Sequence, residues 1–268
     1  MDSTQNISQP RALVLDITSE NIGYLTHGNG EAIASGKIKL DTHTGEYRKA
    51  LENAVYDNAF LLEPYRSTAI ALHSQHFQLL PQELIDAGLT NKVMETSFSK
   101  LQGEVLTCTV AGTDAGIACD VEKGVVGFLR RTFPGACILH HLAPLCAYCV
   151  NAYKEDNACL HVCVDGKEAH IVVVRQGKLL MANTYHHRTP DDVIYFVLNV
   201  WKTCGLDSHR DKLMLTGDNN LRSTLATKLR EWIACVMPEV MPAQALHLGR
   251  DIFSLPFNLI ATALYENY

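Results

Sequence analysis

The sequence predicts an α/β protein of two tandem domains, each a mixed sheet built from a βββαβ core with flanking helices. The first observation is the stretch from Cys159 to Gly217, where three strand-like runs joined by tight turns precede an amphipathic helix and a fourth strand. The second observation is that residues 11–72 show the same order of patterns. Repetition on this scale indicates that one structural unit occurs twice in the chain.

The copy nearer the C-terminus has the clearer local signals. Thr189 is placed to cap a helix whose first position is Pro190, and Gly205 is a natural end for it. Apolar residues between Val193 and Trp201 recur at the spacing of one helix face. The strand-like runs of this copy are residues 159–165, 169–175, 178–185 and 212–216.

The first copy repeats this layout with weaker helix-capping and turn signals. A Gly28-Asn-Gly30 turn joins its second and third strands, and Thr44 is expected to cap the helix that follows. Asp16 and Asp165 each end the first strand of their copy. The strand-like runs of the first copy are residues 11–16, 21–27, 31–40 and 67–72.

Further elements are expected between and after the two copies. Pro81 opens a short helix that Gly88 ends, and residues 90–99 are expected to be a polar connection. Pro144 begins a helix that leads into the second copy, and Pro256 begins a terminal helix. The remaining expected strands are residues 104–111, 116–120, 136–140 and 244–248, and the remaining expected helices are residues 121–133 and 221–232.

The domain boundary is expected at the short, polar passage Tyr153–Asn157. Residues 1–10 are polar and lack the apolar core of a signal peptide, so they are expected to form a loose tail. We therefore predict a first domain over residues 11–155 and a second over residues 156–268.

Composition excludes several classes of function. With 47% hydrophobic and 19% charged residues, the 268-residue chain has enough apolar material for two compact cores. The net charge of −6 and the dispersed basic residues argue against nucleic acid or an anionic membrane as partner. No apolar run is long enough for membrane insertion. An odd count of nine cysteines favours reduced thiols, and hence a cytoplasmic protein.

Four segments carry a resemblance to a known group: Phe77–Leu84, His140–Leu145, Gly177–Tyr185 and Thr189–Asp207. With them, the tandem βββαβ units resemble the actin-like ATPase architecture, a duplicated ribonuclease H-like fold. Over nearly its whole length the chain resembles DUF3822, an uncharacterised bacterial family best known from Bacteroidetes, which implies a fold and no established activity. More distantly, the layout is similar to the cytoplasmic actin-like assembly proteins of type II secretion and type IV pilus systems.

This resemblance directs attention to a nucleotide site between the two domains. An active member of the architecture needs small or hydroxyl residues after the first strand of each domain, where backbone N–H groups meet phosphates. It also needs a carboxylate at each of those strand ends for Mg²⁺ and a glycine-rich turn beside adenine. The candidate residues here are Asp16, Thr18, Ser19, Asp165, Gly166 and Gly217.

The match to an active site is incomplete. The first turn has no glycine at residue 17 or 18, although Thr18 and Ser19 could supply hydroxyls. In the second turn Gly166 comes one place early, and Gly217 is followed by Asp218, not by a second glycine. The nucleotide site is therefore expected to be degenerate, and no residue is assigned a catalytic role.

A zinc site is the competing chemical hypothesis. Cys146 and Cys149 have the C-x-x-C spacing, and five other potential ligands occur nearby. However, the pair lies on an apolar helix, and buried cysteine is common as a small apolar residue. We therefore expect no metal at these positions. The other potential ligands are His140, His141, Cys159, His161 and Cys163.

The sequence thus favours a cytosolic, non-enzymatic protein that acts through protein–protein contact, for example by strand addition at an exposed sheet edge. The protein partner is not identified, and a homo-oligomer is compatible with the sequence. The alternative is a divergent Mg²⁺-dependent ATPase or phosphotransferase, with ATP and Mg²⁺ as ligands between the domains.

Overall fold

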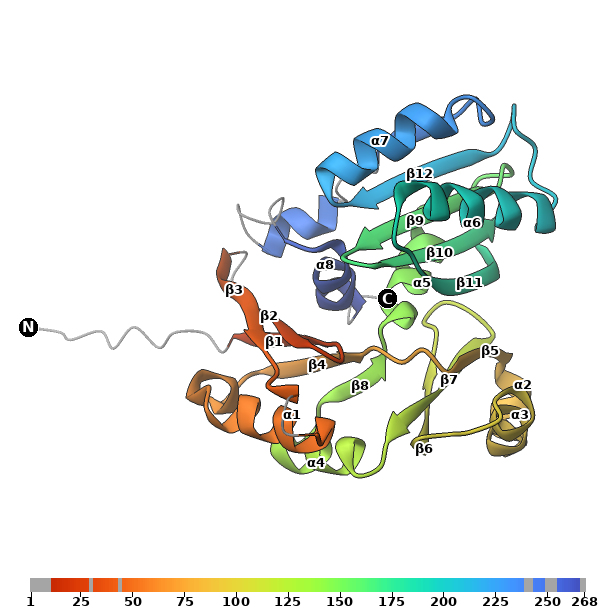
Figure 1. Ribbon diagram of the computed structural model, residues 1–268. Coiled ribbons are helices and arrows are strands. Elements are labelled where there is room, and N and C mark those ends of the chain that lie inside the picture. The colour runs from red at the N-terminus through yellow and green to blue at the C-terminus, as the bar shows by residue number, and fades with distance from the viewer. Residues whose placement is uncertain (1–10, 29–30, 43–44, 239–242, 249–254, 266–268) are drawn as a thin grey trace, which may run out of the picture.

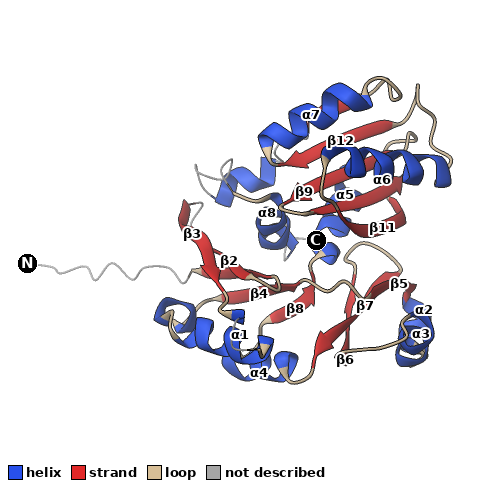
Figure 2. Ribbon diagram, in the orientation of Figure 1, coloured by secondary structure: helices blue, strands red, loops and turns tan. Residues whose placement is uncertain are grey.

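The computed structural model describes residues 11–28, 31–42, 45–238, 243–248 and 255–265. Figure 1 shows two α/β halves, with helices α5 (Leu142–Ala152) and α8 (Phe257–Leu264) between them. In Figure 2 the strands form the centre of each half, and most helices lie on the outside. Within the described residues, none of the helices combines the length and apolar character needed to span a bilayer.

The first half is built on a five-stranded sheet in the order β3-β2-β1-β4-β8. Strand β1 is antiparallel to β2 and parallel to β4, and β8 extends the sheet in parallel to β4. Alternate residues of β1 therefore face opposite sides, with Leu13 and Leu15 toward α1 and α4 and Val14 toward α8. The elements are β1 (Ala12–Ile17), β2 (Asn21–Gly28), β3 (Glu31–Lys39), α1 (Tyr47–Tyr56), a 3₁₀ helix (Ala59–Leu62), β4 (Ser67–Leu72), α4 (Val125–Thr132) and β8 (Cys137–His140).

The second half repeats this topology in the order β11-β10-β9-β12-β13. Strand β9 is again antiparallel to its successor β10 and parallel to the strand that follows the helix, β12. The predicted duplication of a βββαβ unit is therefore confirmed. The elements are β9 (Cys159–Asp165), β10 (Glu168–Arg175), β11 (Lys178–His186), α6 (Pro190–Thr203), β12 (Lys212–Gly217), α7 (Asn219–Leu229) and β13 (Val236–Pro238).

The first half also contains a small third sheet, in the order β5-β7-β6, between β4 and β8 in the chain. The prediction missed β5, and it was wrong about residues 90–99, which contain the helix α3. Only Thr90 and Met94 of α3 are buried, so this helix has little apolar periodicity for the sequence to reveal. The elements are β5 (Phe77–Pro81), α2 (Gln82–Asp86), α3 (Thr90–Ser97), β6 (Gly103–Thr109) and β7 (Ala115–Glu122).

Helices α5 and α8 form the apolar contact between the halves. Residues 142–150 of α5 and all of α8 are buried, and the two helices pack against each other. Helix α5 contacts the second sheet through β10 and β11, whereas α8 contacts β1, β2 and β4 of the first sheet. The C-terminal helix thus packs on the N-terminal half, and the domain boundary at residue 155 stays a prediction.

Several element ends differ from the prediction for identifiable reasons. The expected strand at residues 244–248 is part of a 3₁₀ helix, Ala243–Leu248, and β13 is the edge strand instead. Helix α4 starts at Val125 because residues 121 and 122 belong to β7. Helix α1 has Glu46 as its N-cap; Thr44, the Asn29-Gly30 part of the predicted turn and residues 1–10 lie outside the described residues.

The predicted start of α6 is confirmed in atomic detail. The Asp192 backbone N–H donates to Thr189 Oγ1 over 3.3 Å, and the Thr189 backbone N–H donates to Asp192 Oδ2 over 2.8 Å. Pro190 occupies the first helical position, where no N–H is needed. By contrast, α7 ends at Leu229, before the Trp232 that was expected to close it.

Two glycines of the second half offer a matched test of backbone packing. Both have positive φ, but a Cβ on Gly217 would lie 1.9 Å from the Val164 carbonyl oxygen, whereas one on Gly166 would meet nothing within 4 Å. We expect Gly166→Ala to lower the free energy of unfolding by about 1 kcal/mol, the usual cost of a left-handed residue. Gly217→Ala adds a backbone clash and should cost roughly 3 kcal/mol or more. Urea unfolding measures both, and equal effects would contradict the close β12–β9 approach.

Candidate functional site

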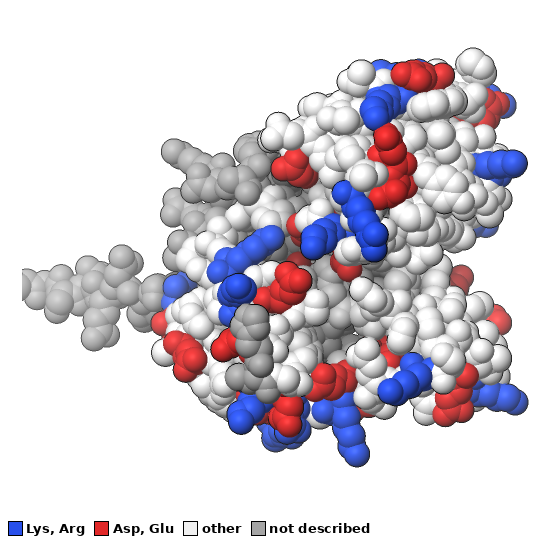
Figure 3. All heavy atoms as spheres, in the orientation of Figure 1, with Lys and Arg blue, Asp and Glu red and all other residues white. Residues whose placement is uncertain are grey.

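A cleft of about 920 Å³ lies between the two halves, at the carboxyl ends of β1 and β9. Figure 3 shows acidic and basic side chains gathered on the face where the halves meet. Carboxylates outnumber lysines along the lining, which gives the cleft an acidic character. The acids are Asp16, Glu20, Asp120, Glu122, Asp165 and Glu168; the basic side chains are Lys37, Lys167, His73, His76 and His186.

Most of the residues predicted for the nucleotide site meet in this cleft. Five of them line it: Asp16, Thr18, Ser19, Asp165 and Gly166. Gly217 is absent from the described lining. It ends β12 and packs directly on the Val164 backbone, so close strand contact accounts for that glycine.

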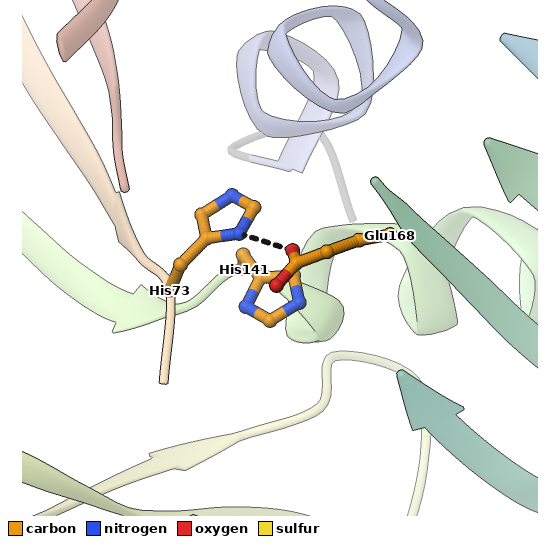
Figure 4. Close-up of side chains that lie close together, drawn as sticks. All are labelled: His73, His141 and Glu168. Carbon is orange, nitrogen blue, oxygen red and sulfur yellow. Dashed lines mark hydrogen bonds and ion pairs between the residues drawn. The ribbon is translucent and has the colours of Figure 1, made fainter. Parts of the chain in front are cut away.

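The centre of the cleft contains an imidazole held between two carboxylates. His73 follows β4, the parallel neighbour of β1, so it lies beside Asp16 at the same sheet edge. Its Nε2 is 2.8 Å from Asp16 Oδ1, and its Nδ1 is 3.2 Å from Glu168 Oε2. Glu168 begins β10 of the second half, and Figure 4 shows its contact with His73 as a dashed line. This trio of Asp16, His73 and Glu168 links the two halves.

The charges of the trio follow from its geometry. Burial lowers the pKa of His73, but the attraction of Asp16 and the hydrogen bonds to both carboxylates outweigh it and raise that pKa to about 10. Burial alone would raise the pKa of Glu168. The hydrogen bond with His73 and the positive charge of His73 outweigh burial and lower that pKa. At neutral pH His73 is therefore an imidazolium that donates both N–H groups to carboxylates.

The first turn uses its polar groups for its own structure. Thr18 Oγ1 accepts from the backbone N–H groups of Asn21 over 2.9 Å and Glu20 over 3.2 Å, and donates to the Asn21 carbonyl. The Thr18 backbone N–H also donates to the Asn21 carbonyl. The predicted phosphate-binding hydroxyl of Thr18 is thus committed to the hairpin, while Ser19 is exposed.

The second predicted carboxylate has a different environment. Asp165 Oδ1 is 4.0 Å from Lys37 Nζ, a side chain of β3 in the other half. Burial raises the pKa of Asp165, with Lys37 opposing and Asp16 reinforcing the change. Gly166 occupies the turn after β9 with φ +58°. The cleft thus brings Asp16 and Asp165 together, each with a cationic neighbour from this chain.

Further histidines lie directly beneath the trio. His141 stacks on His73 with ring centroids 3.9 Å apart, and His140 and His170 lie 4.2 Å and 4.8 Å from His141. Burial lowers the pKa of all three, to about 3 for His140 and about 4 for His170. His141 Nε2 and His170 Nδ1 both contact the Thr184 hydroxyl, at 3.2 Å and 3.0 Å. These three rings are therefore neutral.

The cysteines of the zinc hypothesis lie in the core. Cys149 Sγ is 3.0 Å from His161 Nδ1, and His161 Nε2 is 3.0 Å from the Thr216 hydroxyl, all of them buried. Of the described residues, one group of three His, Cys, Asp or Glu side chains has ligand atoms close enough for a shared ion: His73, His141 and Glu168. It contains none of the cysteines.

The sequence-based prediction missed His73, Glu168 and His170. One usable signal existed for His73: it directly follows the fourth strand, and in a βββαβ unit that strand is the parallel neighbour of the strand ending at Asp16. Polar residues at the carboxyl ends of adjacent parallel strands meet at one edge. Glu168 carries no comparable signal, because its partner His73 comes from the other half, and His170 bonds to Thr184 of the neighbouring strand β11, inside its own half.

The duplicated halves and the cleft between them define a protein of actin-like ATPase fold. The chain belongs to the family described as "Protein of unknown function (DUF3822)", whose model matches residues 2–236. A comparison with curated proteins gave no match.

Two solved structures show the fold. A Bacteroides thetaiotaomicron VPI-5482 protein with actin-like ATPase fold and unknown function superposes with a TM-score of 0.78 at 20% identity, covering 94% of this chain and 96% of that one. The PilM–PilN type IV pilus biogenesis complex gives a TM-score of 0.61 at 15% identity, covering 96% and 98%. At these identities the similarity establishes architecture, in agreement with the fold predicted from the sequence.

The buried ion link can be tested by removing its cation. We expect His73→Ala to lower the free energy of unfolding by roughly 3–5 kcal/mol, because it leaves the buried Asp16 without a partner. Adding Asp16→Asn should recover part of this loss, since a neutral amide is cheaper to bury than an unpaired charge. Denaturant unfolding of the single and double variants gives both values.

The matched control for this test is His76→Ala. His76 lines the same cleft, but its side chain is 38% exposed, and its partner Asp120, 3.6 Å away, also accepts from the backbone N–H groups of Gln102 and Gly103. Its removal should therefore cost less than about 1 kcal/mol. A loss for His73→Ala no larger than that of the control would contradict a strong link through His73.

Proposed function

We propose that this protein works through protein–protein contact and that its cleft does not hold Mg²⁺-nucleotide. The observation that carries the proposal is the imidazolium of His73 between Asp16 and Glu168. In an actin-like ATPase site the carboxylate at the end of the first strand holds the waters of Mg²⁺. Here that carboxylate is 6% exposed and already bonded to an internal cation.

The other parts of a nucleotide site also fit poorly. The Thr18 hydroxyl is hydrogen-bonded within its own turn, and Gly217, the predicted neighbour of adenine, packs against Val164. Asp165 has Lys37 for a neighbour, which opposes the approach of a metal ion. The divergent-ATPase alternative would need the trio to open before Mg²⁺ could reach Asp16.

A contact surface is available at the edge of the second sheet. Strand β11 is an edge strand of the second sheet. A bulge in β11 leaves Leu180 without a partner residue in β10, and Leu180 is 47% exposed. Beside the edge, Tyr185 stacks on Phe196 of α6, and Phe196 contacts Tyr195, which is 66% exposed. An open edge flanked by an aromatic surface suits a partner that adds a strand.

The structural relative that forms a complex adds support at the level of fold. The PilM–PilN assembly pairs a protein of this architecture with a different chain. By analogy, the partner here is a second protein chain; a second copy of this chain is the other arrangement that an edge strand permits.

Titration with Mg²⁺-ATP tests the first half of the proposal. A ligand bound at 100 times its dissociation constant would stabilise the protein by about 2.7 kcal/mol and raise its melting midpoint. We expect no saturable rise in the midpoint for the wild-type protein. A rise that disappears in Asp165→Asn would contradict the proposal and favour the ATPase alternative.

Site-specific photocrosslinking in cells tests the second half. With a photoreactive residue at Tyr195 we expect one discrete adduct, which should be lost when Leu180→Lys places a charge on the strand edge. The matched position is Trp232, an apolar side chain that is 50% exposed beyond the end of α7 and should give no adduct. Equal adducts from both positions, or an adduct indifferent to Leu180→Lys, would contradict the β11 surface.

A further inference from the structure

Three side chains at the base of the cleft present ligand atoms to one small volume. His73 comes from the end of β4, His141 from the N-cap of α5 and Glu168 from the start of β10. One potential ligand atom from each lies within 4.8 Å of the others. Figure 4 shows the three side chains close together. Two imidazole nitrogens and a carboxylate oxygen are a donor set for a divalent transition metal such as Zn²⁺ or Co²⁺, and a poor one for Mg²⁺.

The pair His73 and Glu168 is already close to ligand spacing. His73 Nδ1–H donates to Glu168 Oε2 over 3.2 Å, and a metal ion between the two atoms would replace that proton. The opposite ring nitrogen, Nε2, would keep its bond to Asp16 Oδ1 at 2.8 Å. A carboxylate that orients a ligand histidine through its second nitrogen is a recurrent outer-shell arrangement in metal sites.

His141 supplies the independent observation. Its Nδ1 is buried and has no hydrogen-bond partner among the described residues, which is costly for a polar atom unless something binds there. Its Nε2 lies 3.2 Å from Thr184 Oγ1, whose hydroxyl also contacts His170 Nδ1. When His141 Nε2–H donates to Thr184 and Thr184 donates to His170, the lone pair of His141 Nδ1 is left free.

We propose that His73 Nδ1, His141 Nδ1 and Glu168 bind one divalent transition-metal ion, which ties β4 and α5 of the first half to β10 of the second. The rings of His73 and His141 are parallel within 8°, so the in-plane lone pairs of their nitrogens do not point at one common position. His141 therefore turns about its side-chain bonds when the ion binds. His73 and Glu168 line the cleft, which provides an entry path and room for water ligands. The site uses two members of the trio, His73 and Glu168. Because His73 Nε2 keeps its bond to Asp16, that carboxylate remains closed to Mg²⁺-nucleotide, as in the proposed function.

Co²⁺ titration of the metal-stripped full-length protein tests the site. We expect visible ligand-field absorption that saturates at one ion per chain, displacement of Co²⁺ by Zn²⁺, and no displacement by Mg²⁺. The Glu168 side chain is 26% exposed, and Glu168→Gln keeps its shape. This variant should weaken Co²⁺ binding at least tenfold. His141→Phe removes the second ligand while keeping a ring in the stack, and should act similarly.

His209→Ala is the matched control, because His209 is an exposed histidine outside the cleft and its loss should leave the titration unchanged. Circular dichroism identifies any variant that fails to fold, and folded Glu168→Gln alone is enough for the test. Absence of stoichiometric binding, binding unchanged in folded Glu168→Gln, or intense thiolate charge-transfer bands that place the ion on cysteines would each overturn the proposal.

Discussion

The relation between the two halves depends on a buried imidazolium between two carboxylates. Taking a charge out of water is expensive, and it is tolerated only when opposite charges and hydrogen bonds compensate. His73 obtains both from Asp16 at 2.8 Å and Glu168 at 3.2 Å, one in each half. The arrangement requires that the ends of β1, β4 and β10 stay in fixed register, so it selects one relative position of the two halves.

Apolar packing between the two halves provides stabilisation that the ion link alone would not. Helix α5 is buried along residues 142–150, and α8 packs on it and on the first sheet. Non-directional burial of this kind stabilises many similar arrangements, whereas hydrogen-bonded charges distinguish among them. His141 stands where the two meet, because it is the N-cap of α5 and stacks on His73. The polar centre and the apolar interface therefore act on the same segment.

The sequence predicted those features whose causes are local. The second half could be outlined because Thr189, Pro190 and the glycine turns act on their own neighbours, and Asp16 and Asp165 stood out as acids at strand ends. Strand β5 and helix α3 were missed because their buried residues are few and their partners are distant in sequence. The trio was missed for the same reason: 57 residues separate His73 from Asp16 and 95 separate it from Glu168.

The two copies also show how one backbone plan acquires different chemistry. His73 follows β4 and bonds to Asp16, whereas at the equivalent place after β12 stands Asp218, which accepts the N–H groups of Asn220 and Leu221 as the N-cap of α7. One copy thus places a base beside its strand-end acid, and the other has a helix-capping acid at that place in the chain. Asp165 consequently has its cationic neighbour, Lys37, across the cleft. Because strand pairing involves only backbone groups, the polar residues at these strand ends can change without altering the sheet, and the chemistry of the cleft depends on them.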